Sequence, residues 1–465
     1  MFISAAIGGD VATNSLFQIT GTSIILGATV VVLVVLLVVC IGGGNHRGEN
    51  PPPSPPAHFL LGHLNIMSSS PPPPWVTLDK IGKEYGDVMS LKVGHWAIML
   101  NTFAAIKDAA LNYAKEMGSR PVNYSSNMLN ENGKDISLGS YSPDWVLLRE
   151  LGIRNLRADA SVHERVSKLM GGDLYTYIVG PRNKADVIPC LRHIPSSGIR
   201  FIKNTTSDLN GLLRSEFKRH KESLDPENLR DLMDGVINAR NLGQKADPEK
   251  YKFMTDTHVY QVISNYLGGT TAGFIVASLW SLTLMVANPE KQEKIASEVT
   301  SVVGEDRKPG LDDRDSLVYV RAAIEEILRY ACIAPLSVPH KTTQDITFRG
   351  YSVPKDTSVL ANFYGLHFNE EFWPAPFEYK PERFIDEGGN FQSKAHMFPF
   401  GYGVRACPAQ PEARQLVYLI LSWLTHRYAI TRVPGEEQKD ILQQDPQVQV
   451  ARAPAPFDVI LQRRF

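Results

Sequence analysis

Hydrophobic residues are concentrated first near the N-terminus, where residues 22–42 form an apolar run without a single charged side chain. About 20 apolar residues suffice for a helix to cross the hydrocarbon core of a membrane. A cleaved signal peptide is the alternative. However, no Lys or Arg precedes the run, and the run is longer than the apolar part of a typical signal peptide. The pattern therefore predicts a single transmembrane helix over 22–42.

The residues that flank this run predict its orientation. Asp10 is the only charged residue before it, whereas His46 and Arg47 follow it. By the positive-inside tendency, residues 1–21 are expected on the luminal side and the rest of the chain on the cytoplasmic side. Prolines crowd residues 43–56, and we expect a semi-rigid hinge there because proline fixes φ and removes an N–H donor.

Beyond the hinge, residues 57–465 are expected to form one large body in which apolar residues recur mostly at helical spacing. Helices are predicted over 75–86, 143–156, 197–224, 254–304, 316–331 and 411–427. The segment 254–304 is apolar in its middle, so its helix is expected to run through the protein interior rather than to form a second membrane span. Short segments that alternate or are rich in β-formers predict strands over 87–101, 346–354 and 357–367. The fold is therefore predicted to be mainly α with a minor β part.

Composition narrows the class of protein. The chain has 465 residues, a formal net charge of −1 and 43% hydrophobic residues, which excludes a disordered chain. The lack of a basic field argues against nucleic acid as a partner. The cysteines Cys40, Cys190, Cys332 and Cys407 are far apart, which favours neither a disulfide framework nor a cysteine-based zinc site.

Cys407 stands apart because of the loop that contains it, FPFGYGVRACPAQ over 398–410. Thiolate binds metal, and the N-terminus of the helix that follows is expected to lower the pKa of this thiol. Gly401 and Gly403 allow a tight turn and close approach by a flat ligand, and Arg405 can reach an anionic group. These features together suggest haem, whereas a lone cysteine taken by itself is more often a buried structural residue.

The loop resembles the haem-binding signature of the cytochrome P450 family. Phe400, Gly403, Arg405 and Cys407 occupy the signature positions, with Ala409 in place of the final glycine. The resemblance implies that Cys407 is the axial ligand of the haem b iron and that Phe400, Gly403 and Arg405 belong to the cofactor site.

Two further motifs carry the resemblance. Glu326 and Arg329 match the family's Glu-x-x-Arg, and Arg383 lies in the PERF stretch 381–384. In the family these three residues form a buried network behind the haem loop, so we expect them to be in contact, although Glu326 and Arg329 alone could be a surface pair. Trp145 and Arg149 are similar to the family's Trp-x-x-x-Arg, which implies that Arg149 binds a haem propionate.

His340 is similar to a family residue that contacts the other propionate; a solvated loop histidine is the alternative. The resemblance covers essentially the whole chain and implies the cytochrome P450 fold, with residues 57–465 as a haem-thiolate catalytic domain. Several stretches, among them 130–149 and 339–384, look most like the animal branch that includes steroid 17α-hydroxylases and aryl-hydrocarbon hydroxylases.

The chain departs from the family in the central helix, which usually carries an acid followed by a threonine for proton delivery. Here the ungapped position of the acid holds Ala272 and that of the threonine holds Gly273. A shifted frame makes Thr270 or Thr271 the catalytic alcohol, but no frame supplies the acid. Asn265 and Ser264 are expected to lie on a different helical face. A second departure is the stretch 165–185, which is shorter than in the family.

The resemblance implies a monooxygenase that inserts one atom of dioxygen into a lipophilic substrate such as a steroid, a lipid or an aromatic xenobiotic. Electrons would come from NADPH–cytochrome P450 reductase, with cytochrome b5 as a further candidate partner, at the endoplasmic reticulum membrane. The lost acid leaves two alternatives open, namely a haem-thiolate isomerase or lyase acting on a lipid peroxide and a non-catalytic haem-binding membrane protein. Expected substrate contacts are the loop 123–141, residues 267–274 and residues 333–338.

Overall fold

The computed structural model describes residues 48–58, 62–68, 71–122, 127–128, 130–158, 197–435, 440–446, 448 and 451–465. The predicted luminal segment 1–21, transmembrane helix 22–42 and shortened stretch 165–185 lie outside these residues. So does the first part of the hinge, up to residue 47. The described part is mainly helical with three small sheets, which confirms the predicted α-rich fold with a minor β part.

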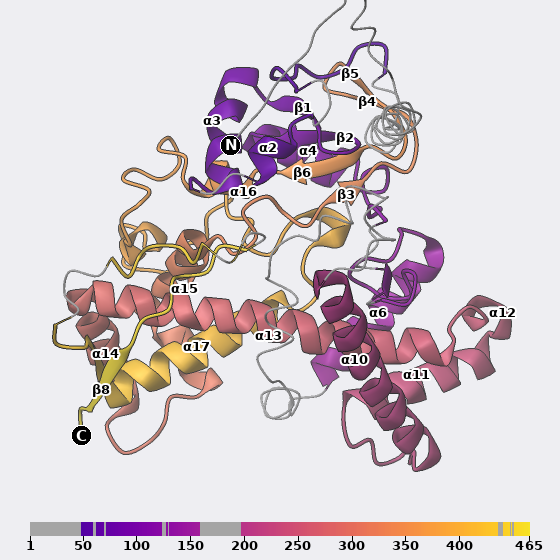
Figure 1. The fold of residues 1–465 in the computed structure, drawn as a ribbon. Helices are drawn as coiled ribbons and strands as arrows, with labels where there is room; N and C mark the ends of the chain where they lie inside the picture. Colours follow the sequence, from indigo (N-terminus) through magenta and orange to yellow (C-terminus); the bar gives the residue numbers. More distant parts are fainter. Residues whose placement is uncertain are drawn as a thin grey trace, which may run out of the picture.

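Helix α13 (Asp256–Ala287) is the axis of the molecule and connects its two helical ends (Figure 1). Among the described helices it is the one that is long and apolar enough to cross a membrane, but 56% of its most apolar window is buried inside the body. The composition of α13 therefore does not distinguish it from a membrane-spanning helix. Its burial inside the body does distinguish it, which confirms the predicted interior helix.

The prediction of one continuous helix over 254–304 is wrong. Helix α13 ends at Ala287, and Pro289 begins a separate helix, α14 (Pro289–Val303). Proline lacks the N–H that a continuing helix needs, but it fits a first helical turn, where that N–H would have no partner. Gly268, Gly269 and Gly273 do not interrupt α13.

Three helices pack around the C-terminal half of α13. They are α14, α15 (Val318–Ala331) and α17 (Gln410–Arg427), and α13 lies beside α17 and α15 in Figure 1. Their apolar faces form the largest core of the described protein, which includes Trp280, Leu284, Ile295, Val320, Ile327, Tyr418 and Leu421.

The N-terminal half of α13 is covered by a second group of helices. These are α6 (Pro143–Ala158), α10 (Ser197–Glu222) and α11 (Leu232–Ala246), and the short α12 (Pro248–Tyr251) packs against α11. They share a separate core that includes Leu148, Leu213, Phe217, Val236, Val259 and Tyr266. The junction between the two cores lies near the middle of α13, where glycines replace large side chains.

The largest sheet lies at one side of the helical body, at the top of Figure 1. Its strand order is β1-β2-β6-β3, with β1 (Val88–Lys92) antiparallel to β2 (Trp96–Leu100) and β2 parallel to β6 (Ser358–Ala361). Strand β3 (His340–Lys341) pairs with β6, and His340 lies opposite Val359. This pairing places His340 in a strand rather than in a solvated loop.

Smaller elements complete the fold. Two hairpin-like pairs are β4 (Ile346–Phe348) with β5 (Tyr351–Val353) and β7 (Tyr428–Arg432) with β8 (Val459–Arg463). The remaining helices are α2 (Leu64–Ser68), α3 (Pro74–Tyr85), α4 (Phe103–Asn112) and α16 (Phe363–His367), with short turns η2 (Leu311–Ser316), η3 (Pro381–Phe384) and η4 (Gly403–Arg405). The segment 357–367, predicted as strand-like, is thus a strand followed by a helical turn.

The described end of the hinge is attached to the body. Ser90 of β1 donates from its backbone N–H to the Pro53 carbonyl oxygen (2.7 Å) and from its hydroxyl to that of Pro52 (2.9 Å). The Asn50 carbonyl oxygen accepts from the Ser352 N–H (2.7 Å). Residues 50–53 are therefore held against the two sheets.

Candidate functional site

A cavity of about 460 Å³ lies between α13, α17, β3 and the loop that contains Cys407. Its size falls within the usual range of cofactor and ligand sites. Among the predicted site residues, Arg149, His340, Phe400, Arg405 and Cys407 line it. Substrate contacts were predicted from three segments, and the wall includes residues of each, namely Ile136, Ser137, Gly269, Ala272, Gly273, Phe274, Ile333, Ala334, Ser337 and Val338.

The cysteine loop is shaped by two glycines. Gly401 and Gly403 have φ angles of +80° and +60°, which confirms that the tight turn needs them. Gly403 also lies against α4, because a Cβ there would meet the Ala110 Cα at 3.5 Å. The loop closes when the Cys407 N–H donates to the Phe400 carbonyl oxygen (2.7 Å). Ala409, with φ −104°, has no need of the glycine that the signature usually has there.

The pKa of the Cys407 thiol is raised, not lowered as the sequence analysis expected. Burial is the largest cause, and it outweighs the hydrogen bond from the Ala409 backbone and the attraction of Arg149. Pro408 and Pro411 lack N–H groups, so the start of α17 offers the sulfur few donors. The helix N-terminus alone does not hold the thiolate, and a metal ion would have to displace the proton.

Arg120, Arg149 and Arg405 come from three different segments and line the same cavity. Their guanidinium groups donate to backbone carbonyl oxygens of Gly118, Ser137, Gly139, Val338, Pro339 and Ala406. Burial lowers the pKa of Arg120 to about 10 and that of Arg405 to about 8, and repulsion among the three cations adds to this. Asp135 is the carboxylate whose charge opposes the shift at both Arg120 and Arg405.

Trp145 and Gly403 lie behind the cavity wall rather than in it. The Trp145 ring lies against the guanidinium of Arg405, with the central carbon 3.7 Å from the ring centre, and that of Arg149 at 5.5 Å. The Trp145 indole N–H donates to the Ile136 carbonyl oxygen (3.1 Å). Trp145 therefore holds both arginines from the side away from the cavity.

His340 is buried, which excludes the solvated loop histidine. Burial, followed by the charges of Arg120 and Arg405, lowers its pKa well below the usual value, so its ring is neutral. The Met117 carbonyl oxygen lies 3.1 Å from Nδ1, so Nδ1 carries the proton and Nε2 is an acceptor. Tyr402 stacks on this ring at 4.8 Å, and its buried hydroxyl has no hydrogen-bond partner in the described part of the chain.

The three residues of the predicted buried network are in contact, as expected. Arg329 donates through Nε and Nη2 to the two Glu326 oxygens (2.7 and 2.9 Å), and Arg383 donates to Glu326 at 3.3 Å. Glu326 and Arg329 have no exposed surface, so the surface-pair alternative is excluded. Carbonyl oxygens of Pro374, Ala375, Pro376 and His367 accept the other guanidinium protons.

His367 connects this network to the cysteine loop, which the sequence analysis did not foresee. Its carbonyl oxygen accepts from Arg329 (2.7 Å), and its Nε2 accepts from the Phe398 N–H (3.1 Å). Its Nδ1, which must carry the proton, is buried without a partner in the described chain. Burial and the charge of Arg329 lower the His367 pKa to about 3.

The face of α13 that lines the cavity carries no acid. Gly269, Ala272 and Gly273 line it, and Cβ atoms built on the two glycines would meet nothing within 4 Å. The backbones of Thr270 and Thr271 belong to α13, and their side chains lie outside what the structure describes. The acid is therefore missing from the part of the cavity wall that α13 forms, as it is from the sequence of this helix.

The expectation that Asn265 lies on a different helical face is wrong, since it lines the cavity about two turns before Ala272. Its Oδ1 accepts from the backbone N–H groups of Ile136 and Ser137 (3.0 and 2.9 Å). Asn265 thus holds the loop over the cavity. Glu412 in the first turn of α17 also lines the cavity, and its buried Oε2 has no hydrogen-bond partner among the described residues.

Arg120, Asn265, Tyr402 and Glu412 had no role assigned from the sequence. Arg120 gave no signal, because an arginine before a proline has no distinctive spacing. The seven-residue distance from Asn265 to Ala272 could have been recognised as one helical face.

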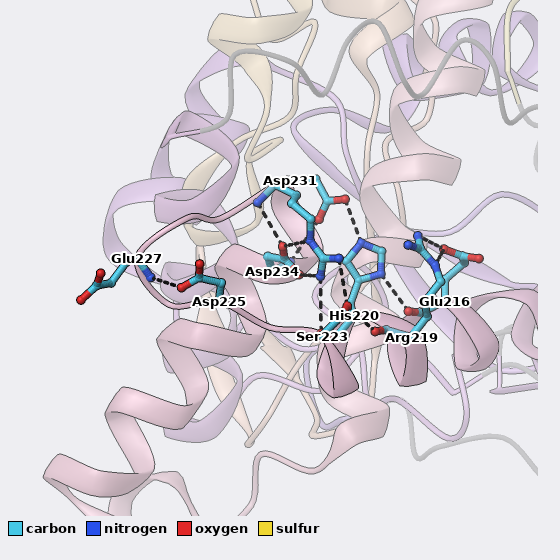
Figure 2. A network of polar contacts seen from close by, with 9 residues as sticks. Glu216, Arg219, His220, Ser223, Asp225, Glu227, Asp231 and Asp234 are labelled. Atoms are coloured by element: carbon cyan, nitrogen blue, oxygen red, sulfur yellow. Dashed lines mark hydrogen bonds and ion pairs between the residues drawn. The ribbon is translucent and has the colours of Figure 1, made fainter.

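A second cluster of polar residues lies between the end of α10 and the start of α11 (Figure 2). Ligand atoms of His220, Asp231 and Asp234 lie within 4.8 Å of one another, which is compatible with a metal ion. Arg230, however, donates to both Asp234 oxygens (2.6 and 2.8 Å), and the His220 ring lies 2.9 Å from Asp231. A cation would have to displace the guanidinium, so the cluster acts as a clamp between two helices.

The profile of the Cytochrome P450 family matches residues 170–461, which is more than half of the chain. The chain therefore belongs to the cytochrome P450 family, and its cofactor is haem b. It is a haem-dependent monooxygenase of the microsomal type that acts on lipophilic substrates with a redox partner.

Curated relatives place it more closely. A steroid 17-alpha-hydroxylase/17,20 lyase of Ictalurus punctatus is 27% identical over 451 residues, covering 84% of this chain and 87% of the relative. The enzyme of the same name from Squalus acanthias is 25% identical and covers 79% and 84%. Cytochrome P450 2U1 of Homo sapiens is 25% identical and covers 84% and 81%. These relatives confirm the similarity to the animal branch that the sequence predicted.

The buried His367 predicts a specific dependence of stability on pH. The pKa of His367 is about 3 in the folded protein and near 6.5 in the unfolded chain. Protonation therefore favours the unfolded chain, so the free energy of unfolding is highest above pH 6.5 and falls as the pH drops below that value. Between pH 6.5 and 4.5 the wild type should lose about 1–3 kcal/mol more unfolding free energy than His367→Gln, which keeps an acceptor but does not titrate. Urea unfolding at several pH values measures this difference.

The exposed His58→Gln is the control and should follow the wild type. Parallel curves for the wild type and His367→Gln would show that His367 does not couple stability to pH.

Proposed function

We propose that Cys407 is the axial ligand of the haem iron and that the cavity beside it holds both the haem and a steroid-like substrate. The observation that supports this proposal is that three arginines, the buried Arg120 and Arg405 and the half-buried Arg149, line one cavity together with a lone thiol. The nearby carboxyl groups, Asp135 and Glu412, are fewer than the three guanidinium groups. Two haem propionates would add negative charge beside the arginines, which supports the fit of haem to the site.

His340 fits the same ligand. The His340 Nδ1–H donates to the Met117 carbonyl oxygen, so Nε2 could form a hydrogen bond with a carboxylate only if it also carried a proton. A propionate beside it would raise its pKa again and so favour uptake of that proton. The Tyr402 hydroxyl next to it, which has no hydrogen-bond partner among the described residues, is a further donor for the same group.

When bound, thiolate-ligated haem supplies the activation of dioxygen. The chain's own residues would do the rest. Trp145 and Asn265 would keep the arginines and the loop 136–137 in place, so that the cofactor and substrate meet a preformed wall. Burial of the cavity would exclude bulk water. Ala272 and Gly273 have no side chain that can hold a proton, so a chain of ordered waters would deliver it, with Thr270 or Thr271 as the candidate alcohol.

The substrate class is proposed from the part of the cavity wall that α13 and residues 333–338 form. The lining residues of these segments are apolar apart from Asn265, Tyr266 and Ser337. Such a wall favours a rigid apolar molecule with one or two polar groups. The names of the relatives agree with a steroid as the first candidate.

Partners and location are proposed on the same basis. NADPH–cytochrome P450 reductase would deliver the electrons, with cytochrome b5 as an additional donor. The charge-free residues 22–42 would anchor the protein in the endoplasmic reticulum membrane as a single helix, with the catalytic domain in the cytosol.

The empty acid position on α13 favours one alternative. An isomerase or lyase acting on a lipid peroxide would need no external electrons and no relay of protons. Dependence on NADPH and reductase distinguishes it from the monooxygenase.

Restoring the missing pair should improve the use of electrons. We expect Ala272→Asp with Gly273→Thr to raise the fraction of NADPH converted to product by about tenfold, because a placed acid speeds proton transfer by at least that factor. The measurement is NADPH consumed and product formed from progesterone as the steroid probe, with purified reductase.

Gly269→Thr is the matched control, since it also adds a side chain to open space on the same face. Product formed without NADPH or reductase would refute the monooxygenase. Unchanged coupling in the double variant would show that the missing acid does not limit the reaction.

Arg120→Gln should weaken haem binding by about ten- to a hundredfold, because it removes one charge-assisted hydrogen bond to a propionate. Transfer of haem to apomyoglobin measures the loss. The exposed Arg154→Gln on α6 is the control and should behave like the wild type. Equal retention in Arg120→Gln and the wild type would exclude Arg120 from the cofactor site.

A further inference from the structure

Arg452 is a buried arginine that has no part in the proposed cofactor site. It lies in the C-terminal segment, is 9% exposed, and donates through Nη1 to the carbonyl oxygens of Tyr330 and Ala331. In the described part of the chain no carboxylate pairs with it. A buried cation without a counter-charge is costly, so its position calls for a physical explanation.

Two features compensate the charge. Tyr330 and Ala331 end α15, and the last carbonyl oxygens of a helix carry partial negative charge and have no partner within the helix. The guanidinium also lies in a cage of three aromatic rings, at 4.6 Å from Trp280 and 5.1 Å from Tyr330 and Phe368. Arg452 thus caps α15 from within an aromatic cage.

The backbone of the same residue joins two further segments. Its N–H donates to the Ile333 carbonyl oxygen (2.9 Å), and its carbonyl oxygen accepts from the Trp280 indole N–H (2.9 Å). Each segment that meets at Arg452 continues into the cavity wall, where the lining residues are Ala277 of α13, Leu328 of α15, Ile333 and Ala334 after α15, and Ala451 next to Arg452.

We propose that Arg452 is a positioning residue that fixes three parts of the cavity wall relative to one another and so sets the size of ligand that fits beside the haem. It does not touch the cofactor or the substrate. The proposal rests on the proposed function for its ligand readout, whereas the clamp itself is a property of the chain.

The clamp is tested by hydrogen–deuterium exchange on the full-length protein. Arg452→Met places an apolar side chain in the aromatic cage and removes the charge and the side-chain hydrogen bonds. Arg452→Lys keeps the charge. In Arg452→Met, peptides covering 328–336 and 451–456 should exchange about tenfold faster, as expected for the loss of one charge-assisted hydrogen bond, and Arg452→Lys should lie in between. Arg427→Met, which removes a guanidinium from the Phe465 ring, is the control and should leave both peptides unchanged.

The consequence for ligand size is tested with two probes that bind haem iron. The Kd for imidazole, measured by the Soret shift, should stay within about twofold of the wild-type value. The Kd for the larger 4-phenylimidazole should rise about tenfold in Arg452→Met and recover in part in Arg452→Lys.

The outcomes separate the two claims. A wild type that shows no Soret band refutes the proposed function, while the exchange result still decides the clamp. Unchanged exchange in Arg452→Met overturns the clamp. Faster exchange with an unchanged ratio of the two Kd values overturns the role in ligand size.

Discussion

Positive charge in the protein interior that outnumbers the nearby carboxyl groups is the constraint on which the site depends. Arg120, Arg149 and Arg405 lie around one cavity, and each is held by backbone carbonyl oxygens. Such an arrangement is unfavourable by itself, because burial and mutual repulsion both oppose the charged form, as the lowered pKa of Arg405 reflects. A bound ligand with two carboxylates would offset both the cost of burial and the mutual repulsion of the arginines. The cavity is therefore suited to an anion, and haem, the cofactor of the family, carries two carboxylates beside a flat apolar ring.

The same chemistry organises the support of the site. Glu326 balances Arg329 and Arg383 in the interior, and backbone carbonyl oxygens satisfy the remaining donors. His367 connects this network to the cysteine loop, because its ring accepts a hydrogen bond from the Phe398 N–H. Trp145 performs the corresponding task for Arg405 and Arg149 from the other side. These contacts position the Cys407 thiol but do not deprotonate it. Its pKa therefore stays raised until a metal ion is bound.

Local patterns predicted much of this. Helical spacing located α6, α10, α15 and α17 within a few residues, and two motifs correctly predicted the contacts among Glu326, Arg329 and Arg383. Features that depend on tertiary contacts were missed. Arg120 has no sequence signal because its neighbours come from distant segments, and the burial of His340 follows from the pairing of β3 with β6. The break at Pro289 was visible in the sequence, but the continuous apolar pattern outweighed it.

The central claim is that Cys407 binds the iron of a haem held in this cavity. Its most direct test is the carbon monoxide difference spectrum of the dithionite-reduced protein, recorded for the wild type and for Cys407→Ala. The account predicts a red-shifted Soret band of the thiolate type in the wild type and its loss in the variant. The same band in Cys407→Ala, or no haem band from a well-folded wild type, would contradict it.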